Sequence, residues 1–452
     1  MTGRETLGSR LGFILLAAGC AIGLGNIWKF PFMVGEYGGG AFVLIYLVFL
    51  AILGVPLLSV ELTIGRASQH SPARMCRVLE PEGSRWHLHG YMCIVGTYLL
   101  MSFYVVITGW IIKYAISALT GDFGGMDSAG VADFFTSMST DPVVTVGFVV
   151  LVVILGFTVC SIGLRNGLER ITKYMMLALL AIMLLLVAYA LTMPGAAEGL
   201  RFYLVPDIDR MMDEGPLKVI VAAMSQAFFT LSIGIGSMAV FGSYIGKEHR
   251  MLGESIRIAV LDLLVAFMAG LIIFPACFSY DVPVGSGPNL IFVTLPNIFN
   301  NMVGGHVLGF LFFIFMSFAA LSTVFAVFEA IVSNMMDLTG WSRRRSCAFN
   351  MVAMCILALP SALGFSILSG IQPLGADSTI LDLSDKILSQ ILLPVGSIVM
   401  LAFCTSKRGW GWESFRSEAN TGEGMAFPDG LRRYMTYVLP LIVIILLVMG
   451  LV

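Results

Sequence analysis

Glycines and polar residues interrupt the first long apolar segment of the chain, in the stretch GCAIGLGNIWKFP at residues 19–31. A helix that crosses a membrane has no water nearby to satisfy freed backbone groups, so a break in it requires compensating partners. An unwound turn exposes carbonyl oxygens that suit a hard cation, and the amides of a helix N-terminus suit a carboxylate. The stretch therefore predicts a binding site for an ion or a small molecule. The alternative is that Gly19 and Gly23 form a GxxxG face for helix packing.

A second stretch of this kind, TLSIGIGSM at residues 230–238, interrupts the sixth apolar segment. Paired glycine-rich interruptions at matching places in two halves of a chain indicate an inverted-repeat transporter with its site near the membrane midplane. A packing face explains neither this second interruption nor Asn26 and Lys29 beside the first. We therefore favour the binding site.

The segments that hold these residues predict an all-α polytopic membrane protein. Of the 452 residues, 58% are hydrophobic and 12% charged, and apolar runs long enough to cross about 30 Å of hydrocarbon recur along the chain. Most of the 26 lysines and arginines fall in alternate loops, which places the N-terminus in the cytoplasm and the C-terminus outside. We expect eleven spans, near residues 11–34, 39–65, 89–119, 143–162, 167–192, 217–245, 255–280, 304–336, 346–365, 380–405 and 432–452.

The chain shows no pattern typical of enzyme chemistry. Its five histidines form no HExxH spacing, its eight cysteines show no paired spacing, and it has no GxSxG elbow or phosphate-binding loop. We therefore expect no enzyme activity, no organic cofactor and no nucleic-acid partner.

Five segments, in order, resemble the signature segments of the neurotransmitter:sodium symporters. They are GCAIGLGNIWKFPF, GGGAF at residues 38–42, PLLSVELTIGR at 56–66, QAFFTLSIGIGS at 226–237 and SGPNLIFVTLP at 286–296. The form is that of the bacterial amino-acid transporters of the LeuT and MhsT type. The similarity extends from Arg4 through the tenth span.

This resemblance implies a LeuT-like 5+5 inverted repeat with unwound helices 1 and 6, alternating access, and a place in the plasma (inner) membrane of a bacterium. The first repeat would cover residues 1–192. The second would cover residues 193–405, with an extracellular lid near 285–302. A cytoplasmic loop and helix 11 would cover residues 406–452.

The resemblance also implies two sodium sites. The first would use Ala21, Asn26, Thr230 and Asp262 together with the substrate carboxylate. The second would use the carbonyls of Gly19, Ile22 and Ala319 and the hydroxyls of Ser322 and Thr323. A carboxylate at the centre of a span costs about 2.5–3.5 kcal/mol, so a partner is expected for Asp262; otherwise it faces a water-filled crevice or stays protonated. The alternative for Ser322 and Thr323 is hydrogen bonding to the preceding helical turn.

An amino-acid substrate follows from the same resemblance. Its carboxylate would meet sodium, the amides of Gly23, Leu24 and Gly25, and the Tyr104 hydroxyl, and its ammonium would meet the carbonyls of Ala21, Phe229, Thr230 and Ser232. Its side chain would lie among Leu24, Leu100, Phe229, Ile235, Thr323 and Val327. That lining is apolar and uncharged, which favours a hydrophobic amino acid. Such a stripe is otherwise ordinary core packing.

Two pairs of charges are expected to act as gates, again by resemblance. They are Lys29 with Asp385 on the outside, above Tyr104 and Phe229, and Arg4 with Asp337 on the inside, supported by Tyr244 and Glu329. Exposed ion pairs contribute about 0–1 kcal/mol, which suits a latch that must open. The alternative is that each charge only solvates the end of its helix.

Four residues depart from the family pattern near moving parts, two of them near the inner gate, where Leu7 replaces the usual tryptophan and Glu329 replaces glutamine. Lys29 stands where most relatives have arginine, so the bidentate fork is lost. Leu177 stands ten residues after Gly167, where bacterial relatives often have a proline that helps the fifth helix to unwind. The outer latch is therefore expected to be looser, and cytoplasmic release to follow a different opening.

Asp262 bears on chloride. In animal members of the family a chloride ion offsets the charge of the first sodium, whereas chloride-independent relatives carry a nearby carboxylate. Tyr46, Gln226 and Thr230 resemble parts of the anion site, Ala266 is uncharged, and Asp262 supplies a negative charge one turn earlier. We therefore expect transport to be independent of chloride.

Together these expectations describe a sodium-coupled symporter that imports hydrophobic L-amino acids across the lipid bilayer with two sodium ions. The alternative is a sodium-dependent channel or a receptor-like amino-acid binding protein on the same scaffold. The preferred amino acid, the sodium:substrate ratio and the oligomeric state stay open.

Overall fold

The computed structural model describes residues 5–282, 290–302, 304–376 and 378–451, and within them the regular structure is helical, with no strand. Nine continuous helices of this described part are long and apolar enough to cross a membrane. They are Gly40–Ser68 (α3 and α4), Leu88–Thr120 (α6), Pro142–Ile162 (α8), Leu164–Ala190 (ending in α9), Met251–Ser279 (α14), Gly305–Thr339 (α16), Arg343–Leu363 (α17), Ile380–Thr405 (α18 and α19) and Leu431–Leu451 (α21 and α22).

Two further spans are broken. In the first, α1 (Arg10–Ala21) meets the segment Gly25–Glu36, which ends in α2 (Phe30–Glu36), at an angle of 58°. In the sixth, α12 (Pro216–Thr230) is separated from α13 (Ser237–Gly242) by residues 231–236. The first pair brings the spans among the described residues to ten, and α12 with α13 would make an eleventh, which is roughly consistent with the eleven that the sequence predicts. The predicted all-α fold with unwound helices 1 and 6 is confirmed.

Several spans contain a π-helical turn, in which one extra residue widens the helix. These turns are Gly25–Lys29, Leu50–Gly54, Leu164–Glu169, Ile387–Leu392 and Tyr434–Val438, with another at Leu290–Thr294 outside the spans. The α-helical parts around them are α3 (Gly40–Phe49), α4 (Val55–Ser68), α9 (Arg170–Ala190), α18 (Ile380–Lys386), α19 (Leu393–Thr405), α21 (Leu431–Arg433) and α22 (Leu439–Leu451).

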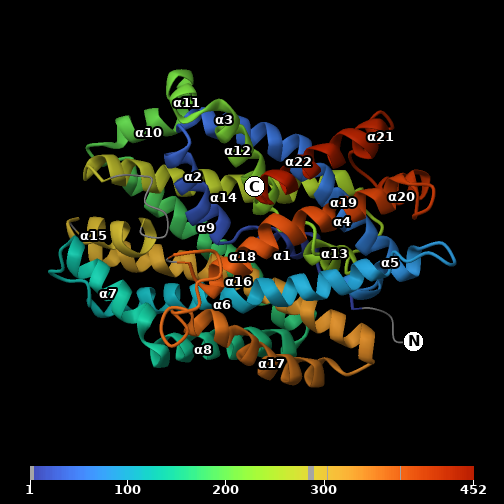
Figure 1. The fold of residues 1–452 in the computed structure, drawn as a ribbon, viewed down its shortest axis with the longest axis horizontal. Helices are drawn as coiled ribbons and strands as arrows, with labels where there is room; N and C mark the ends of the chain where they lie inside the picture. The colour runs from blue at the N-terminus through green and yellow to red at the C-terminus, as the bar shows by residue number, and fades with distance from the viewer. Residues whose placement is uncertain (1–4, 283–289, 303, 377, 452) are drawn as a thin grey trace.

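Shorter helices lie at the two ends of the bundle. They are α5 (Pro72–Leu79), α7 (Ser128–Thr140), α10 (Ala196–Leu204), α11 (Ile208–Glu214), α15 (Leu295–Asn300) and α20 (Trp412–Ala419). Figure 1 shows the long helices running across the view, with α7 and α15 at one end and α5 and α20 at the other. The loops that the charge pattern assigns to opposite sides of the membrane thus lie at opposite ends.

The two breaks lie inside the bundle because the broken spans are surrounded by other helices. α6, α8, α16 and α17 pack against one another, α1 packs against α9, α14 and α16, and α13 packs against α4. Figure 1 places α1 and α13 in the middle of the molecule. A helix that is buried on several sides is apolar around most of its circumference. Most residues of α1 and all residues of α13 are buried. Each break therefore faces protein and not lipid.

The fifth span stays helical past the position where relatives have proline. Gly167 lies in the π-helical turn Leu164–Glu169, and α9 continues from there without interruption. Leu177 lies on α9, and 46% of its surface is exposed. Leucine keeps the backbone hydrogen bond that a proline would remove, so this helix has no built-in break at that residue.

The predicted extracellular lid near residues 285–302 lies partly outside the described residues, which resume at Leu290. Its described part packs on an aromatic cluster: the Tyr114 hydroxyl donates to the Phe292 carbonyl at 2.9 Å, and the Phe292 ring stacks on Phe135 with centroids 4.9 Å apart. α6 and α7 therefore hold this segment over the bundle. The proposed division into repeats stays a prediction.

Candidate functional site

The first break needs a residue without a side chain. Ile22 leaves the helical conformation with φ −69° and ψ 92°, and Gly23 follows it. A Cβ atom at Gly23 would lie 2.7 Å from the Tyr104 hydroxyl and 2.9 Å from the Thr323 hydroxyl. Any larger residue would push α6 or α16 away from the break, so glycine is required there by close approach.

The second break is built from left-handed residues. Ser232, Gly234 and Gly236 have φ values of 51°, 109° and 75°. A Cβ atom at Gly234 would lie 2.2 Å from the backbone oxygen of Leu393 in the tenth span. The glycine thus permits both the backbone turn and the contact between spans 6 and 10.

A buried carboxylate that our sequence analysis did not assign holds this second break. Glu61, on α4, is 1% exposed, and its Oε1 and Oε2 accept hydrogen bonds from the amides of Gly234 and Met238, the latter at 3.2 Å. It therefore satisfies amides that the unwinding frees. Glu61 lies in PLLSVELTIGR, one of the five segments that resemble the family. Like Asp262, it is an acid inside an apolar span, so the same signal could have singled it out.

A small cavity of about 30 Å³ lies between the two breaks. Eleven of the twelve residues predicted to contact substrate line it: Ala21, Gly23, Leu24, Gly25, Leu100, Tyr104, Phe229, Thr230, Ser232, Ile235 and Thr323. Val327 does not line the cavity as the structure describes it. Val327 lies one helical turn beyond Thr323, about 6 Å further along α16, which is past the end of so small a space.

The tenth span also contributes to this cavity, which the sequence did not indicate. Leu388 and Leu393 line it together with Cys20. Leu388 belongs to the π-helical turn Ile387–Leu392. No motif marks an ordinary leucine in an apolar span, so only the tertiary contact identifies it. The described lining carries no charged side chain.

Oxygen atoms converge where α16 passes the first break. The Thr323 hydroxyl lies 3.3, 3.5, 3.4 and 3.4 Å from the carbonyl oxygens of Gly19, Cys20, Ile22 and Ala319. A hydroxyl has one proton, and O–H···O hydrogen bonds are about 2.5–3.0 Å long, so these contacts are not four hydrogen bonds. Ligands at right angles around a hard cation, each about 2.3–2.6 Å from it, lie about 3.3–3.7 Å apart. The four distances from the Thr323 hydroxyl fall in that range.

The Ser322 hydroxyl completes this cluster. It lies 2.9 Å from the carbonyl oxygen of Gly19 and 2.8 Å from that of Ala319. The second contact is the bond to the preceding turn of its own helix that the alternative predicts. The first joins span 8 to span 1, so the structure brings together all five residues predicted for the second sodium site.

A second polar network joins the first, sixth and seventh spans. Asp262 Oδ1 accepts a hydrogen bond of 2.8 Å from the Asn26 side-chain amide, and Oδ2 accepts one of 3.0 Å from the Thr230 hydroxyl. All three side chains are buried. The carboxylate therefore has partners from both broken spans, and three predicted members of the first sodium site are in contact.

The backbone amides that the resemblance assigns to the substrate carboxylate already donate hydrogen bonds to protein atoms. The Gly23 amide donates to Asn26 Oδ1 at 3.3 Å, and the Leu24 amide donates to the Tyr104 hydroxyl at 3.1 Å. Both acceptors are themselves predicted ligands. A carboxylate that bound here would exchange with these acceptors and would need the cavity to widen.

The outer charges are arranged differently from the predicted gate. Lys29 Nζ lies 3.9 Å from the centroid of the Phe229 ring, which is a cation–π contact. Lys29 and Asp385 are both described, and no ion pair joins them, so the predicted pair is not formed in this structure. A lysine ammonium is a point charge without the fork that would hold an arginine on a carboxylate, and here it lies on the aromatic face.

Of the predicted inner pair, Arg4 lies outside the described residues. Asp337 lies near the end of α16, and its Oδ2 accepts a hydrogen bond of 2.6 Å from the Ser71 amide at the start of α5. The aspartate therefore ties span 8 to the loop after span 2. The Arg4–Asp337 pair stays a prediction.

The predicted support of the inner gate has an additional member. The Tyr244 hydroxyl donates to Glu329 Oε1 at 2.6 Å, and Arg343 forms an ion pair with Glu329 at 2.6 Å and another with Glu5 at 3.2 Å. Glu329 is fully buried, and a buried carboxylate without a cation is costly. That cost could have indicated a basic partner, although not that the partner is Arg343.

Nearly the whole chain matches one family of proteins. The model described as "Sodium:neurotransmitter symporter family" matches residues 4–128 and 131–452. The chain belongs to the sodium:neurotransmitter symporter family. This is a family of membrane transporters and not of enzymes, and the spans agree with a multi-pass membrane protein.

Individual symporters of the family resemble this one over nearly its whole length. An uncharacterized sodium-dependent transporter of Bacillus subtilis, YhdH, is 33% identical over 437 residues, which cover 97% of this chain and 95% of that one. A sodium-dependent transporter of Methanocaldococcus jannaschii is 34% identical over 415 residues, covering 88% and 80%. The crystal structure of MhsT in complex with L-phenylalanine matches with a TM-score of 0.88 and 35% identity, covering 99% and 100%. The predicted resemblance is confirmed.

Proposed function

We propose that this symporter imports hydrophobic L-amino acids, coupled to two sodium ions and independent of chloride, across the inner membrane of a bacterium. Its N-terminus would lie in the cytoplasm and its C-terminus outside. One observation carries the proposal: the oxygen cluster around Thr323 and an uncharged cavity meet at the same break in the first span. A cation and an apolar solute would thus share the backbone groups freed by the unwinding.

The lining of the cavity supports a hydrophobic substrate. Leu24, Leu100, Ile235 and Leu388 provide apolar surface, and the described lining contains no charge that would bind a polar side chain. The amides of Gly23 and Leu24, which donate to Asn26 and Tyr104 in this structure, would exchange these acceptors for the substrate carboxylate. The related MhsT structure holds L-phenylalanine. The cavity of about 30 Å³ must expand for any such ligand, so binding is expected to move side chains of the lining.

Two separate sets of oxygen donors support two sodium ions. One set surrounds Thr323 and consists of hydroxyls and carbonyls. The other consists of Asn26, Thr230 and Asp262 and includes a carboxylate. Oxygen ligands are those preferred by hard cations. The second set lies against the amide of Gly23 through Asn26, which would couple that ion directly to the substrate carboxylate.

Chloride independence rests on Asp262. Its carboxyl group is in contact with both Asn26 and Thr230, so a group that can carry the negative charge already lies beside the proposed ion. Gln226, which resembles part of the anion site in animal relatives, donates to the Gly25 carbonyl at 3.1 Å. Ala266 is buried and has no polar atom in its side chain. An anion would therefore add a second negative charge where one suffices.

For the outer gate we propose a cation–π latch between Lys29 and Phe229. The ammonium lies on a ring that also lines the central cavity, so opening of the latch and uncovering of the cavity would be one movement. Lys29→Met should speed substrate release by about two- to fivefold, since an exposed cation–π contact contributes about 0.5–1 kcal/mol. Asp385→Asn is the matched control and should change release less. If a washout assay showed that Asp385→Asn speeds substrate release more than Lys29→Met does, the Lys29–Asp385 ion pair would be the better description of the latch.

Reconstituted vesicles test the function. Uptake of labelled leucine, phenylalanine and alanine is measured with an inward sodium gradient, with choline in place of sodium, and with gluconate in place of chloride. We expect sodium-dependent accumulation above the external concentration and no effect of gluconate. Uptake that persists in choline would refute sodium coupling. Flux without accumulation would indicate a channel, and binding without flux a receptor.

A further inference from the structure

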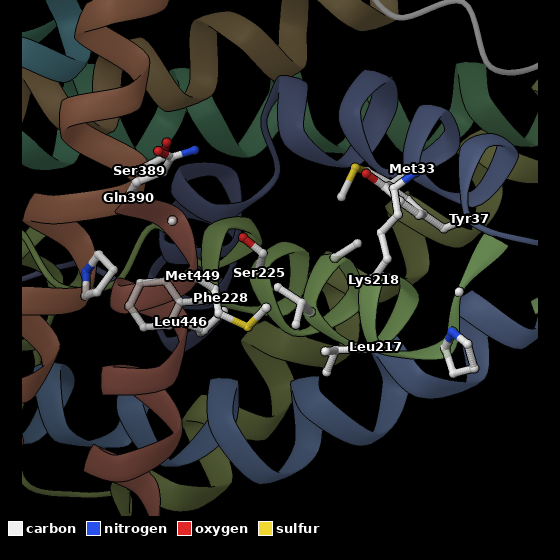
Figure 2. A pocket seen from close by; sticks show the side chains of 16 residues that line it. Met33, Tyr37, Leu217, Lys218, Ser225, Phe228, Ser389, Gln390, Leu446 and Met449 are labelled. Atoms are coloured by element: carbon white, nitrogen blue, oxygen red, sulfur yellow. The ribbon is translucent and has the colours of Figure 1, made fainter. Parts of the chain in front are cut away.

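A cavity larger than the central one lies nearer the periphery of the bundle. Its volume is about 660 Å³, and it opens between the outer halves of both broken spans, α2 and α12, and the helices α19 and α22 (Figure 2). None of the residues assigned to substrate, sodium or gates lines it. Its size falls within the range of about 300–1,000 Å³ that is typical of ligand pockets. The cavity is therefore a candidate for a different ligand.

We propose that this cavity binds one acyl chain of an outer-leaflet phospholipid, with the lipid phosphate at Lys218. This inference concerns a ligand that is not transported. It does not depend on which solute the central cavity accepts. Only its effect on transport, described below, rests on the proposed function.

The length of the cavity fits an acyl chain. Its lining on α12 extends from Pro216 to Phe228, twelve residues apart. At about 1.5 Å per residue this is about 18 Å, close to half of a hydrocarbon core of about 30 Å. α12 starts at Pro216 and ends at the second break, so the cavity extends from the outer interface toward the middle of the bilayer.

The position of the cavity gives lipid access to it. Leu217 is 66% exposed, and Met449, on α22 at the opposite wall, is 40% exposed. Exposed apolar side chains on membrane-spanning helices face hydrocarbon, where phospholipid is the abundant amphiphile. The lining includes Val221, Phe228 and Leu446, which provide apolar surface for a chain.

The outer end of the cavity has a cation for the phosphate. Lys218 is exposed in the first turn of α12, and its Nζ lies 5.3 Å from the centroid of the Tyr37 ring on the facing segment (Figure 2). No carboxylate of the described residues lies within ion-pair distance of Lys218. Glu36 and Glu214 are each adjacent in the chain to a lining residue, Tyr37 and Gly215. A phosphate with an adjacent ammonium, as in phosphatidylethanolamine, complements this arrangement.

Three polar side chains line the interior of the cavity: Ser389 donates to the Asp385 carbonyl at 2.6 Å, and the other two, Ser225 and Gln390, bear on the strength of binding. Ser225 directs its hydroxyl toward the cavity (Figure 2), and the buried Oε1 of Gln390 has no hydrogen-bond partner in the described part of the chain. An acyl chain gives neither group a partner, so both weaken its binding. The bound lipid would therefore exchange with the bilayer. Since α2 and α12 are halves of the broken spans, a lipid between them and α19 would favour the conformation described here.

Photolabelling tests the proposal directly. The protein is placed in nanodiscs that contain phosphatidylethanolamine with a diazirine near the end of one acyl chain, and labelled peptides are mapped by mass spectrometry. We expect labels to concentrate on residues 216–228 and 439–450. Ser225→Phe fills the cavity and should lower this labelling by about fivefold or more. Gln390→Leu removes an unpaired polar atom and should raise it by about fivefold or more.

Matched variants separate this site from ordinary lipid contact. Leu185→Phe, on the lipid-exposed face of α9, should leave the pattern unchanged. Lys218→Gln should lower labelling by about two- to fivefold, and a diazirine glycolipid without phosphate should label wild type to the same reduced extent. Lys113→Gln is the charge control. Even labelling of all lipid-facing helices, or labelling that Ser225→Phe leaves intact in a monodisperse protein, would overturn the proposal. The readout needs no transport, so it can fail while the proposed function stands.

Discussion

Thr323→Val removes one hydroxyl oxygen from the cluster at the first break and keeps the shape of the side chain. The interaction of a neutral polar group with a charge contributes about 1.5–3 kcal/mol, and each 1.4 kcal/mol is a factor of ten, so the sodium Kd should rise about 10- to 150-fold. The hydroxyl lies 3.3–3.5 Å from its carbonyl neighbours, longer than an ordinary hydrogen bond. The free energy of unfolding without sodium should therefore change by less than about 1 kcal/mol.

The assay is a sodium titration of thermal stability, because an ion that binds only the folded state raises Tm with its concentration. Thr323→Val should need more sodium for the same rise, and its sodium dependence of uptake should shift in the same direction. Thr323→Ser keeps the oxygen and is the matched control. An unchanged titration in Thr323→Val would refute the cation cluster and leave Ser322 and Thr323 as groups that only bond to neighbouring turns.

Three other outcomes are expected. Ile235→Phe should reduce uptake of tryptophan more than that of alanine, because overfilling a packed site costs about 1–3 kcal/mol; equal losses would mean that Ile235 does not face the substrate. Asp262→Asn keeps an oxygen ligand but removes the charge, so uptake in gluconate should fall and chloride should restore part of it; full activity without chloride would contradict this role. At Glu80, in the loop before α6, burial favours a higher pKa, but hydrogen bonds from Ser84 and His87 outweigh it and leave the pKa below its usual range. Its contribution to stability is therefore present at neutral pH and lost as pH falls through the lowered pKa, and the Tm difference between wild type and Glu80→Gln should shrink in acid.

Much of the site was predictable because its chemistry is unusual for a membrane. Glycines and Asn26 in an apolar span are costly unless they have a purpose, and Asp262 is costlier still. The structure places Asn26 and Asp262 in contact; the cost of the carboxylate predicted a partner for Asp262, and the family resemblance implied that Asn26 shares its site. Glu61 shows the limit of this reasoning, since the same rule singles it out but does not say that its partners are the amides of the second break.

The charged gates were harder to predict because exposed charges have several partners of similar energy. Lys29 lies on Phe229 and not on Asp385, a choice that depends on about 1 kcal/mol between competing contacts. Glu329 pairs with Arg343, fourteen residues further along the chain, because the turn after α16 brings the start of α17 back beside it. Neither choice follows from residue type.

The sequence alone determined the helical class, the approximate number of spans and the positions of the two breaks. These properties follow from local composition: apolar runs require helices in lipid, and glycines with polar residues mark where a helix cannot continue. Only the tertiary structure decided which side chains from distant spans close the cavity, as with Leu388, and which predicted residue lies beyond it, as with Val327. Leucine and valine satisfy any apolar position equally well, so their place at a site depends on helix packing, which residue types do not encode one by one.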